Sequence, residues 1–201
     1  MFEIIAMLTM FIDHLGVVFF PEQIWFRIIG RIAMPLYTYG IVQGYKYTSN
    51  FKKYLFRLFC IALASQIFYK PLFDTARLNI VFTFLVCLLL LKCLDQTKSN
   101  LKYLFVTLVA CYLEILNFEY GLYAFVLMLI YHFNQKIIWR HNLLNLLYFF
   151  LRNWQIQLFS FLPTILIEKY KNRPLKGTAR LFYRAFYPLH LALLLLISKA
   201  I

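Results

Sequence analysis

Residues Met1 to Phe20 read MFEIIAMLTMFIDHLGVVFF, an apolar run of helix length that contains an adjacent acid and imidazole, Asp13 and His14. A helix of about 20 apolar residues is long enough to cross the hydrocarbon core of a bilayer. Ionisable side chains inside such a helix are expensive unless they are paired or face a polar cavity. The stretch therefore predicts a transmembrane helix and makes Asp13 and His14 the first candidates for chemistry.

The rest of the chain has the same apolar character. Hydrophobic residues make up 63% of its 201 residues, well above the share found in soluble domains. Apolar runs recur from end to end, which predicts a single transmembrane domain over residues 1–201. The net charge of +13 comes from Lys and Arg in short segments between these runs. Such charge indicates membrane topology and contact with anionic lipids rather than nucleic-acid binding.

The predicted fold class is all-α, a polytopic transmembrane helix bundle of about nine helices (roughly eight to ten). Charged residues and Pro, Asn or Gly separate the apolar runs from one another. The helices predicted from these runs are Phe2–Phe20, Ile24–Gly44, Tyr54–Tyr69, Asn79–Leu94, Leu101–Leu116, Tyr120–Phe133, Ile137–Leu151, Gln155–Ile167 and Leu181–Ser198.

The basic residues in the loops predict the orientation, because cytoplasmic loops carry an excess of Lys and Arg. With the N-terminus in the cytoplasm, the outer loops hold only Lys70, Arg77, Arg152 and Lys199. The inner loops then hold Lys46, Lys52, Lys53, Lys92, Lys98, Lys102, Lys136, Arg140, Lys169, Lys171, Arg173, Lys176 and Arg180. The sequence therefore favours a cytoplasmic N-terminus in a multi-pass membrane protein.

Two arginines of the second predicted helix, Arg27 and Arg31, are four residues apart and share a face. Arg27 is expected to reach the outer interface. Arg31 lies one turn deeper and needs a carboxylate or a bound anion, so Asp13 at similar depth is its expected partner. Asp13 and His14 project about 100° apart on a helix. We therefore expect Asp13 to face a neighbouring helix and His14 to face a cavity.

The last predicted helix carries a second polar set in the run FYRAFYPLHLALLLL at 182–196. Tyr187 and His190 are three residues apart and share a face. One interpretation of His190 is a hydrogen bond between helices, and the other is a catalytic role, which a histidine in each terminal helix favours. The histidines His132 and His141 lie near basic loops and are expected at the membrane interface.

Other polar positions have polar packing as their simplest explanation. Asn79 begins the fourth predicted helix, Glu119 and Tyr120 lie in an outer turn, and Gly40 and Gly44 form a GxxxG pattern. That pattern is typical of close helix packing and less often lines a narrow slot. The cysteines lack metal-ligand spacing, and no metal site is predicted.

Four stretches resemble, in order and spacing, the TraX family of bacterial inner-membrane proteins. They are IDHLG at 12–16, IGRIA at 29–33, EYG at 119–121 and FYPLHL at 186–191. The resemblance implies a membrane acetyltransferase, because the founding activity of the family is N-acetylation of a processed pilin. It implies acetyl-CoA as the acyl donor and a peptide or glycan acceptor. The family in turn resembles a wider superfamily of membrane acyltransferases, in which an early-helix histidine is essential, and His14 is the matching position. Glu119 stands where the family pattern has Asp.

A mechanism follows as a hypothesis. Acetyl-CoA enters from the cytoplasm, its pantetheine arm passes Gly40 and Gly44, and its thioester reaches His14, which acts as general base. Asp13 and Arg31 fix the first two helices, and His190 or Tyr187 donates to the oxyanion. The phosphates meet the basic residues Lys46, Lys52, Lys53, Lys171, Arg173, Lys176, Arg180 and Arg184.

Two other functions remain open. A small basic polytopic protein also suits a non-enzymatic assembly factor for pili or secretion, which binds partners without binding acetyl-CoA. A proton-coupled transporter using Asp13, His14 and His190 is disfavoured because no internal repeat is visible. The sequence leaves the acceptor, the acyl chain length and the oligomeric state open.

Overall fold

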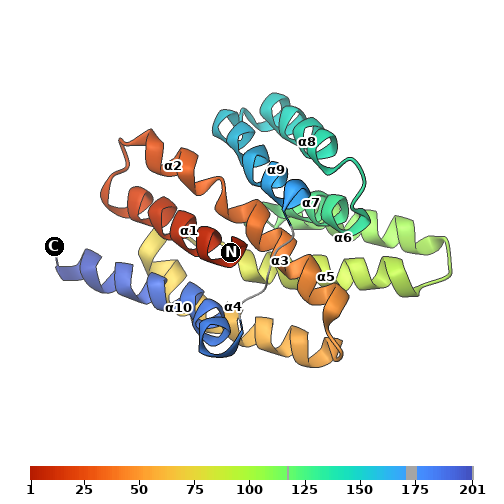
Figure 1. The fold of residues 1–201 in the computed structure, drawn as a ribbon, viewed down its shortest axis with the longest axis horizontal. Helices are drawn as coiled ribbons and strands as arrows, with labels where there is room; N and C mark the ends of the chain where they lie inside the picture. The colour runs from red at the N-terminus through yellow and green to blue at the C-terminus, as the bar shows by residue number, and fades with distance from the viewer. Residues whose placement is uncertain (117, 171–175, 201) are drawn as a thin grey trace.

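The computed structural model describes residues 1–116, 118–170 and 176–200, and every regular element in these ranges is a helix. This confirms the prediction of an all-α chain for the described residues. In chain order the elements are α1 (Phe2–Phe19), α2 (Ile24–Gly30), α3 (Ala33–Tyr47), α4 (Phe51–Phe73), α5 (Ile80–Gln96), α6 (Leu101–Ile115), α7 (Gly121–Phe133), α8 (Ile137–Arg152), the 3₁₀ helix η1 (Gln155–Phe161), α9 (Leu162–Lys169) and α10 (Gly177–Ala200) (Figure 1).

Three of the described helices, α1, α4 and α10, are long and apolar enough to cross a membrane. Helix α7 is also apolar but shorter. The chain is therefore a membrane protein by length and composition of these helices. The number of crossings and the side on which the N-terminus lies stay predictions.

The single helix predicted over Ile24–Gly44 is wrong, because the chain forms α2 and α3 with a turn at Arg31 and Ile32. Pro35 lies in the first turn of α3 and has no N–H to donate to the carbonyl four residues earlier, that of Arg31. Proline suits the first turn of a helix, where the N–H that it lacks would have no partner. Arg31 therefore lies in the turn between α2 and α3.

The predicted helix Gln155–Ile167 is also two elements, η1 and α9. Pro163 occupies the first turn of α9, a position that suits proline because the N–H it lacks would have no partner there. The last helix begins at Gly177 rather than at the predicted Leu181. These differences move boundaries and leave the order of apolar segments unchanged.

Helix α4 is longer at both ends than the predicted helix Tyr54–Tyr69. Its N-cap is Asn50, whose side chain accepts a hydrogen bond from the backbone N–H of Lys53 at 2.9 Å. Asn79, predicted to begin a helix, is instead the N-cap of α5 and accepts from the N–H of Val81 at 3.1 Å. Its amide also donates to Ala62 O at 2.9 Å and so joins α5 to α4.

The first and last helices of the chain lie side by side (Figure 1). Helix α1 packs against α2, α3 and α10, while α10 also packs along α4. Helices α7, α8 and α9 form a neighbouring group that reaches this set through α3. Side chains at the two ends of the sequence can therefore meet in one interior.

The close contact between α1 and α2 depends on Gly16. A Cβ atom at Gly16 would collide with the Cβ and Cγ atoms of Phe26, whereas one at Gly40 would meet only the Tyr183 hydroxyl, at 3.4 Å. We expect Gly16→Ala to lower the free energy of unfolding by about 1–3 kcal/mol through overpacking. Thermal unfolding in detergent measures this, with Gly40→Ala as the matched control. Equal melting temperatures for the two variants would contradict the packing described.

Candidate functional site

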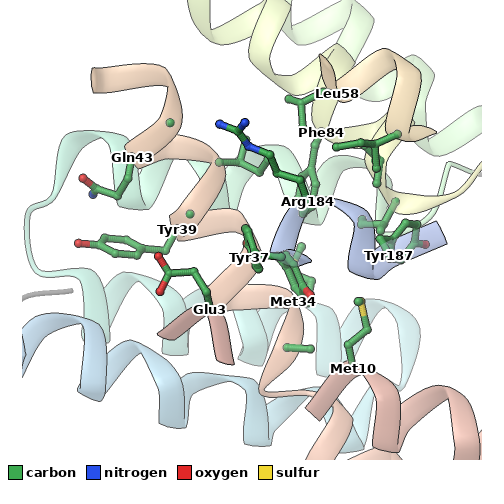
Figure 2. Close-up of a pocket in the computed structure, with 18 of the residues that line it drawn as sticks. Glu3, Met10, Met34, Tyr37, Tyr39, Gln43, Leu58, Phe84, Arg184 and Tyr187 are labelled. Carbon is green, nitrogen blue, oxygen red and sulfur yellow. The ribbon is translucent and has the colours of Figure 1, made fainter. Parts of the chain in front are cut away.

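A cavity of about 870 Å³ runs between α1, α3, α4, α5 and α10. Figure 2 shows side chains from all five helices on its wall, among them Glu3 and Met10 of α1, Tyr37 of α3 and Tyr187 of α10. The residues on each helix follow one another along its length. The cavity is therefore a long channel rather than a shallow surface depression.

One end of the cavity is basic. Its lining there includes Arg57 of α4 and both Arg180 and Arg184 of α10. Arg57 also lies over the ring of Tyr54, with its guanidinium carbon 5.8 Å from the ring centroid. None of these arginines forms an ion pair with an acidic side chain in the described ranges. Unpaired guanidinium groups gathered at a cavity mouth are suited to binding phosphate groups.

Two glycines of α3 lie on the cavity wall. Gly40 and Gly44 line it, and a Cβ atom at Gly44 would collide with the Tyr54 ring and hydroxyl. The rings of Tyr37 and Tyr183 stack at a centroid distance of 5.7 Å across α3 and α10. The GxxxG pattern thus serves close packing against tyrosines and also borders the channel.

The inner end of the cavity holds two stacked imidazoles. His14 Nδ1 lies 2.8 Å from His190 Nε2, and the ring centroids are 5.0 Å apart. Both side chains are buried, with exposed fractions of 8% and 3%. His190 Nδ1 lies 2.8 Å from the carbonyl oxygen of Phe186. His14 lines the cavity, so this pair stands at the end of the channel that begins at the arginines.

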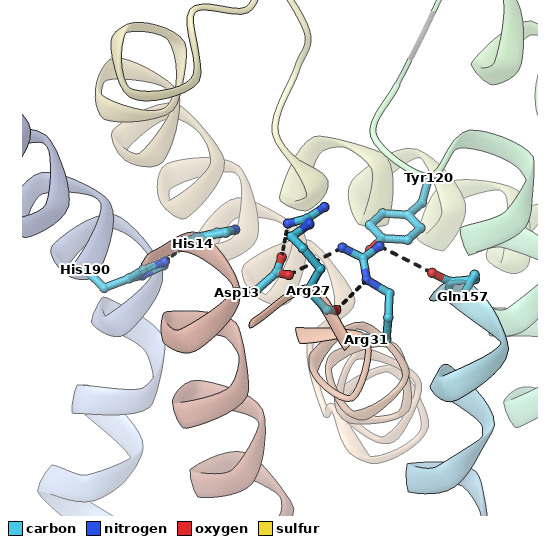
Figure 3. A network of polar contacts seen from close by, with 7 residues as sticks. All are labelled: Asp13, His14, Arg27, Arg31, Tyr120, Gln157 and His190. Carbon is cyan, nitrogen blue, oxygen red and sulfur yellow. Dashed lines mark hydrogen bonds and ion pairs between the residues drawn. The ribbon is translucent and has the colours of Figure 1, made fainter. Parts of the chain in front are cut away.

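Beside the histidines lies a network of charges (Figure 3). Asp13 forms ion pairs with Arg27 at 2.8 Å and with Arg31 at 3.4 Å. Arg31 also donates to the Tyr120 hydroxyl at 2.8 Å and to the Gln157 side-chain oxygen at 3.4 Å. The predicted Asp13–Arg31 pair is present. Arg27, expected only to reach the interface, is both the closer partner of Asp13 and partly exposed.

Glycine allows this network to form. A Cβ atom at Gly30 would collide with the Asp13 carboxylate, so only glycine lets α2 approach α1 closely at this depth. Asp13 and His14 leave α1 in different directions, as predicted, with Asp13 toward α2 and His14 toward α10 (Figure 3). Both nevertheless border the cavity.

Within the described ranges, three polar atoms on the cavity wall are buried without a hydrogen-bond partner: the hydroxyls of Tyr37 and Tyr187 and Oε2 of Glu119. Glu119 belongs to the connection between α6 and α7. Burial of its carboxyl, followed by the nearby Asp13 charge, raises the pKa of Glu119 to about 7. Buried polar atoms normally have partners, so these atoms mark positions where a ligand or water would bond.

The structure brings the predicted catalytic residues Asp13, His14, Arg31, Tyr187 and His190 to one end of the cavity. Glu119 and Tyr120 join them there, whereas Asn79 caps α5 instead.

The predicted phosphate ligands are only partly brought together. Arg180 and Arg184 line the cavity mouth. Lys46 donates to the His132 carbonyl at 2.7 Å, and Lys53, near the start of α4, borders a separate surface hollow with Lys52 and Arg57. Lys176 is exposed, and Arg173 and Lys171 lie outside the described residues.

Sequence reasoning missed Arg57, which looked like an ordinary charge near a helix end. It also placed His141 at the interface, which is wrong because His141 is fully buried. His141 Nε2 lies 2.9 Å from the Tyr123 hydroxyl, and that hydroxyl accepts from Gln157 at 2.9 Å. The sequence did hold one indication of this polar cluster: His141 and Asn145 are four residues apart and so share one face of α8.

These observations define a class: a helical membrane protein with a channel that leads from a basic mouth to a buried histidine pair. The chain belongs to the TraX family, because the family model described as TraX protein matches residues 1–198. It is 26% identical over 152 residues to a Dichelobacter nodosus protein named probable fimbrial assembly protein FimC, serogroup H1. That match covers 67% of this chain and 62% of the relative, so the chain spans about three fifths of the relative's length. No solved structure gives a significant match.

The raised pKa of Glu119 predicts a pH-dependent stability. The folded state binds this proton up to about pH 7, whereas the unfolded chain releases it near the ordinary value of 4.5. The folded protein should therefore lose stability as pH rises from 4.5 to about 7. We expect Glu119→Gln to flatten this decline in melting temperature, measured in detergent.

The matched control is Glu22→Gln, at an exposed position in the α1–α2 connection. This variant should keep the wild-type pH dependence. A Glu119→Gln protein whose melting temperature falls with pH as steeply as wild type would exclude Glu119 as the source.

Proposed function

We propose that this protein is an acetyltransferase embedded in the bacterial inner membrane, crossing it several times with its N-terminus in the cytoplasm. It would move an acetyl group from cytoplasmic acetyl-CoA to an amine or hydroxyl acceptor. The observation that carries this proposal is the single channel that joins the unpaired arginines at its mouth to His14 at its inner end.

The channel suits the donor in charge and shape. Arg57, Arg180 and Arg184 would bind the phosphate groups of acetyl-CoA, since guanidinium groups form paired hydrogen bonds with phosphate oxygens. The pantetheine arm would pass Gly40 and Gly44, where side chains larger than hydrogen would reach the neighbouring tyrosines. From Glu3 to His14 the rise along α1 is about 16 Å, which an extended arm can span.

His14 would act as the general base. It takes a proton from the acceptor nitrogen or oxygen as that atom attacks the thioester carbonyl, and returns the proton to the departing thiolate sulfur. The Tyr187 hydroxyl lines the cavity and has no hydrogen-bond partner among the residues that the structure describes. It would donate to the carbonyl oxygen as that atom becomes negative. Asp13 with Arg27 and Arg31 would hold α1 and α2 at this depth.

The acceptor would be a peptide N-terminus, such as that of a pilin, or an envelope glycan. The name of the Dichelobacter nodosus relative supports a role connected with fimbriae. That same name favours a second candidate function, a non-enzymatic assembly factor for pili or secretion. An assembly factor would bind its partner without binding acetyl-CoA, which separates the two candidates.

The role of His14 predicts that His14→Ala abolishes acyl transfer. Purified protein in detergent should bind acetyl-CoA and hydrolyse it slowly, and the variant should bind it but lose hydrolysis by about 10²-fold or more. Binding is measured by calorimetry and hydrolysis by release of the free thiol. Retention of wild-type turnover in a folded His14→Ala protein would refute this assignment, and absence of binding in wild type would favour the assembly factor.

The basic mouth predicts a separate effect on the donor. Arg57→Met should raise the KM for acetyl-CoA about tenfold with little change in kcat, because it removes a charge-assisted hydrogen bond far from the reacting atoms. Arg77→Met is the control, since Arg77 is exposed and does not line the cavity. The same KM in both variants would exclude the mouth as the phosphate site.

A further inference from the structure

The stacked histidines at the inner end of the channel are linked to a backbone carbonyl in a single line of hydrogen bonds. Phe186 O lies 2.8 Å from His190 Nδ1, and His190 Nε2 lies 2.8 Å from His14 Nδ1. The second ring nitrogen of His14 lies on the side away from His190 (Figure 3). The order of atoms in this line decides which nitrogen of each ring carries hydrogen.

A carbonyl oxygen only accepts, so His190 must donate from Nδ1 to Phe186. In a neutral His190 ring, Nε2 then has no hydrogen and can only accept. The partner atom 2.8 Å away, Nδ1 of His14, must therefore be the donor. Since a neutral imidazole carries one N–H, His14 Nε2 is left with a free lone pair.

The surroundings favour two neutral rings. The His190 ring lies against Phe11 and Phe186, and the His14 ring lies against Phe73. The charged groups that act on His14, besides His190 itself, are the cationic Arg27 and Arg31. Asp13, the acid next in sequence, is paired with those same arginines. A buried imidazolium here would lie among aromatic rings and positive charges, which is unfavourable.

We propose that His190 is a positioning residue that fixes His14 as the Nδ1–H tautomer and leaves the Nε2 lone pair of His14 free in the channel. Free histidine prefers hydrogen on Nε2, the opposite arrangement. Without an acceptor at Nδ1, the nitrogen of His14 that is not bonded to protein would carry the hydrogen and could not take a proton. The importance of this arrangement for catalysis rests on the proposed acetyltransferase function, but the tautomer itself does not.

This role explains why one ionisable residue near each end of the chain is needed at the same point. His190 does not touch the reacting atoms, because its Nε2 is engaged by His14 and its Nδ1 by Phe186. The oxyanion donor would then be Tyr187, whose hydroxyl has no partner in the described part of the chain. His14 would be the catalytic residue, and His190 would act through it.

The test is ¹⁵N NMR of the full chain in lipid nanodiscs with labelled histidine, with signals assigned by single His→Gln replacements. We expect His14 to be neutral, with hydrogen on Nδ1 and none on Nε2. His190→Gln keeps an acceptor oxygen near the position of Nε2, whereas His190→Met has similar length and no such acceptor. The glutamine variant should keep the Nδ1–H tautomer, and the methionine variant should show hydrogen on Nε2.

A His14 ring with hydrogen on Nε2 in wild type would overturn the proposal, and so would a doubly protonated ring. Wild-type protein alone decides this, even where both variants fail to fold. In the hydrolysis assay, His190→Met should lower kcat on the order of 10²-fold with unchanged KM, and His190→Gln should restore most of it. The Nδ1–H tautomer in a protein that fails to bind acetyl-CoA would uphold the positioning and refute the acetyltransferase function.

Discussion

The structure depends on satisfying one buried carboxylate. Asp13 stands in the middle of an apolar helix, and an isolated charge there would be strongly unfavourable. Arg27 and Arg31 both contact this carboxylate. These contacts require a glycine at position 30, where α2 meets α1, and they accompany the turn that separates α2 from α3. Each arginine also has contacts besides Asp13: Arg31 donates to the Tyr120 hydroxyl, and Arg27 is partly exposed. The close packing of α1 on α2, the turn between α2 and α3 and the ion pairs of Asp13 therefore all occur at the same depth.

This constraint also orients the neighbouring helix face. Because Asp13 faces the arginines at α2, the adjacent His14 is turned toward α10, where it is hydrogen-bonded to His190. The ion pairs therefore do more than neutralise charge. They fix the rotation of α1 and so determine which residues border the channel. A helix rotated by about 100° in the direction that turns the imidazole toward α2 would also turn the acid away from its arginines.

The sequence predicted the parts that follow from local chemistry. Apolar run lengths predicted the order of the helical segments, although two of the predicted helices are each divided in two. Equal depth predicted the Asp13–Arg31 pair. The contact of His14 with His190 joins residues 176 positions apart and depends on how α1 packs on α10, which no local pattern specifies. The positions of Arg57 and His141 were missed for the same reason. Charged residues nearby in the sequence do not reveal whether a helix face borders lipid, a channel or the protein core.

The channel wall bears on the choice between enzyme and assembly factor. Each buried polar atom left without a partner destabilises a fold by about 1–3 kcal/mol. In the described residues the channel wall nevertheless holds two tyrosine hydroxyls and one carboxyl oxygen in that state. A protein that only bridges partners at its surface has no use for such atoms in its interior. A protein that receives a polar ligand there does, because the ligand provides the missing bonds. The arginines without carboxylate partners at the mouth follow the same logic for an anionic ligand. These unmet bonds favour a ligand-binding interior, which is what the proposed acetyltransferase requires.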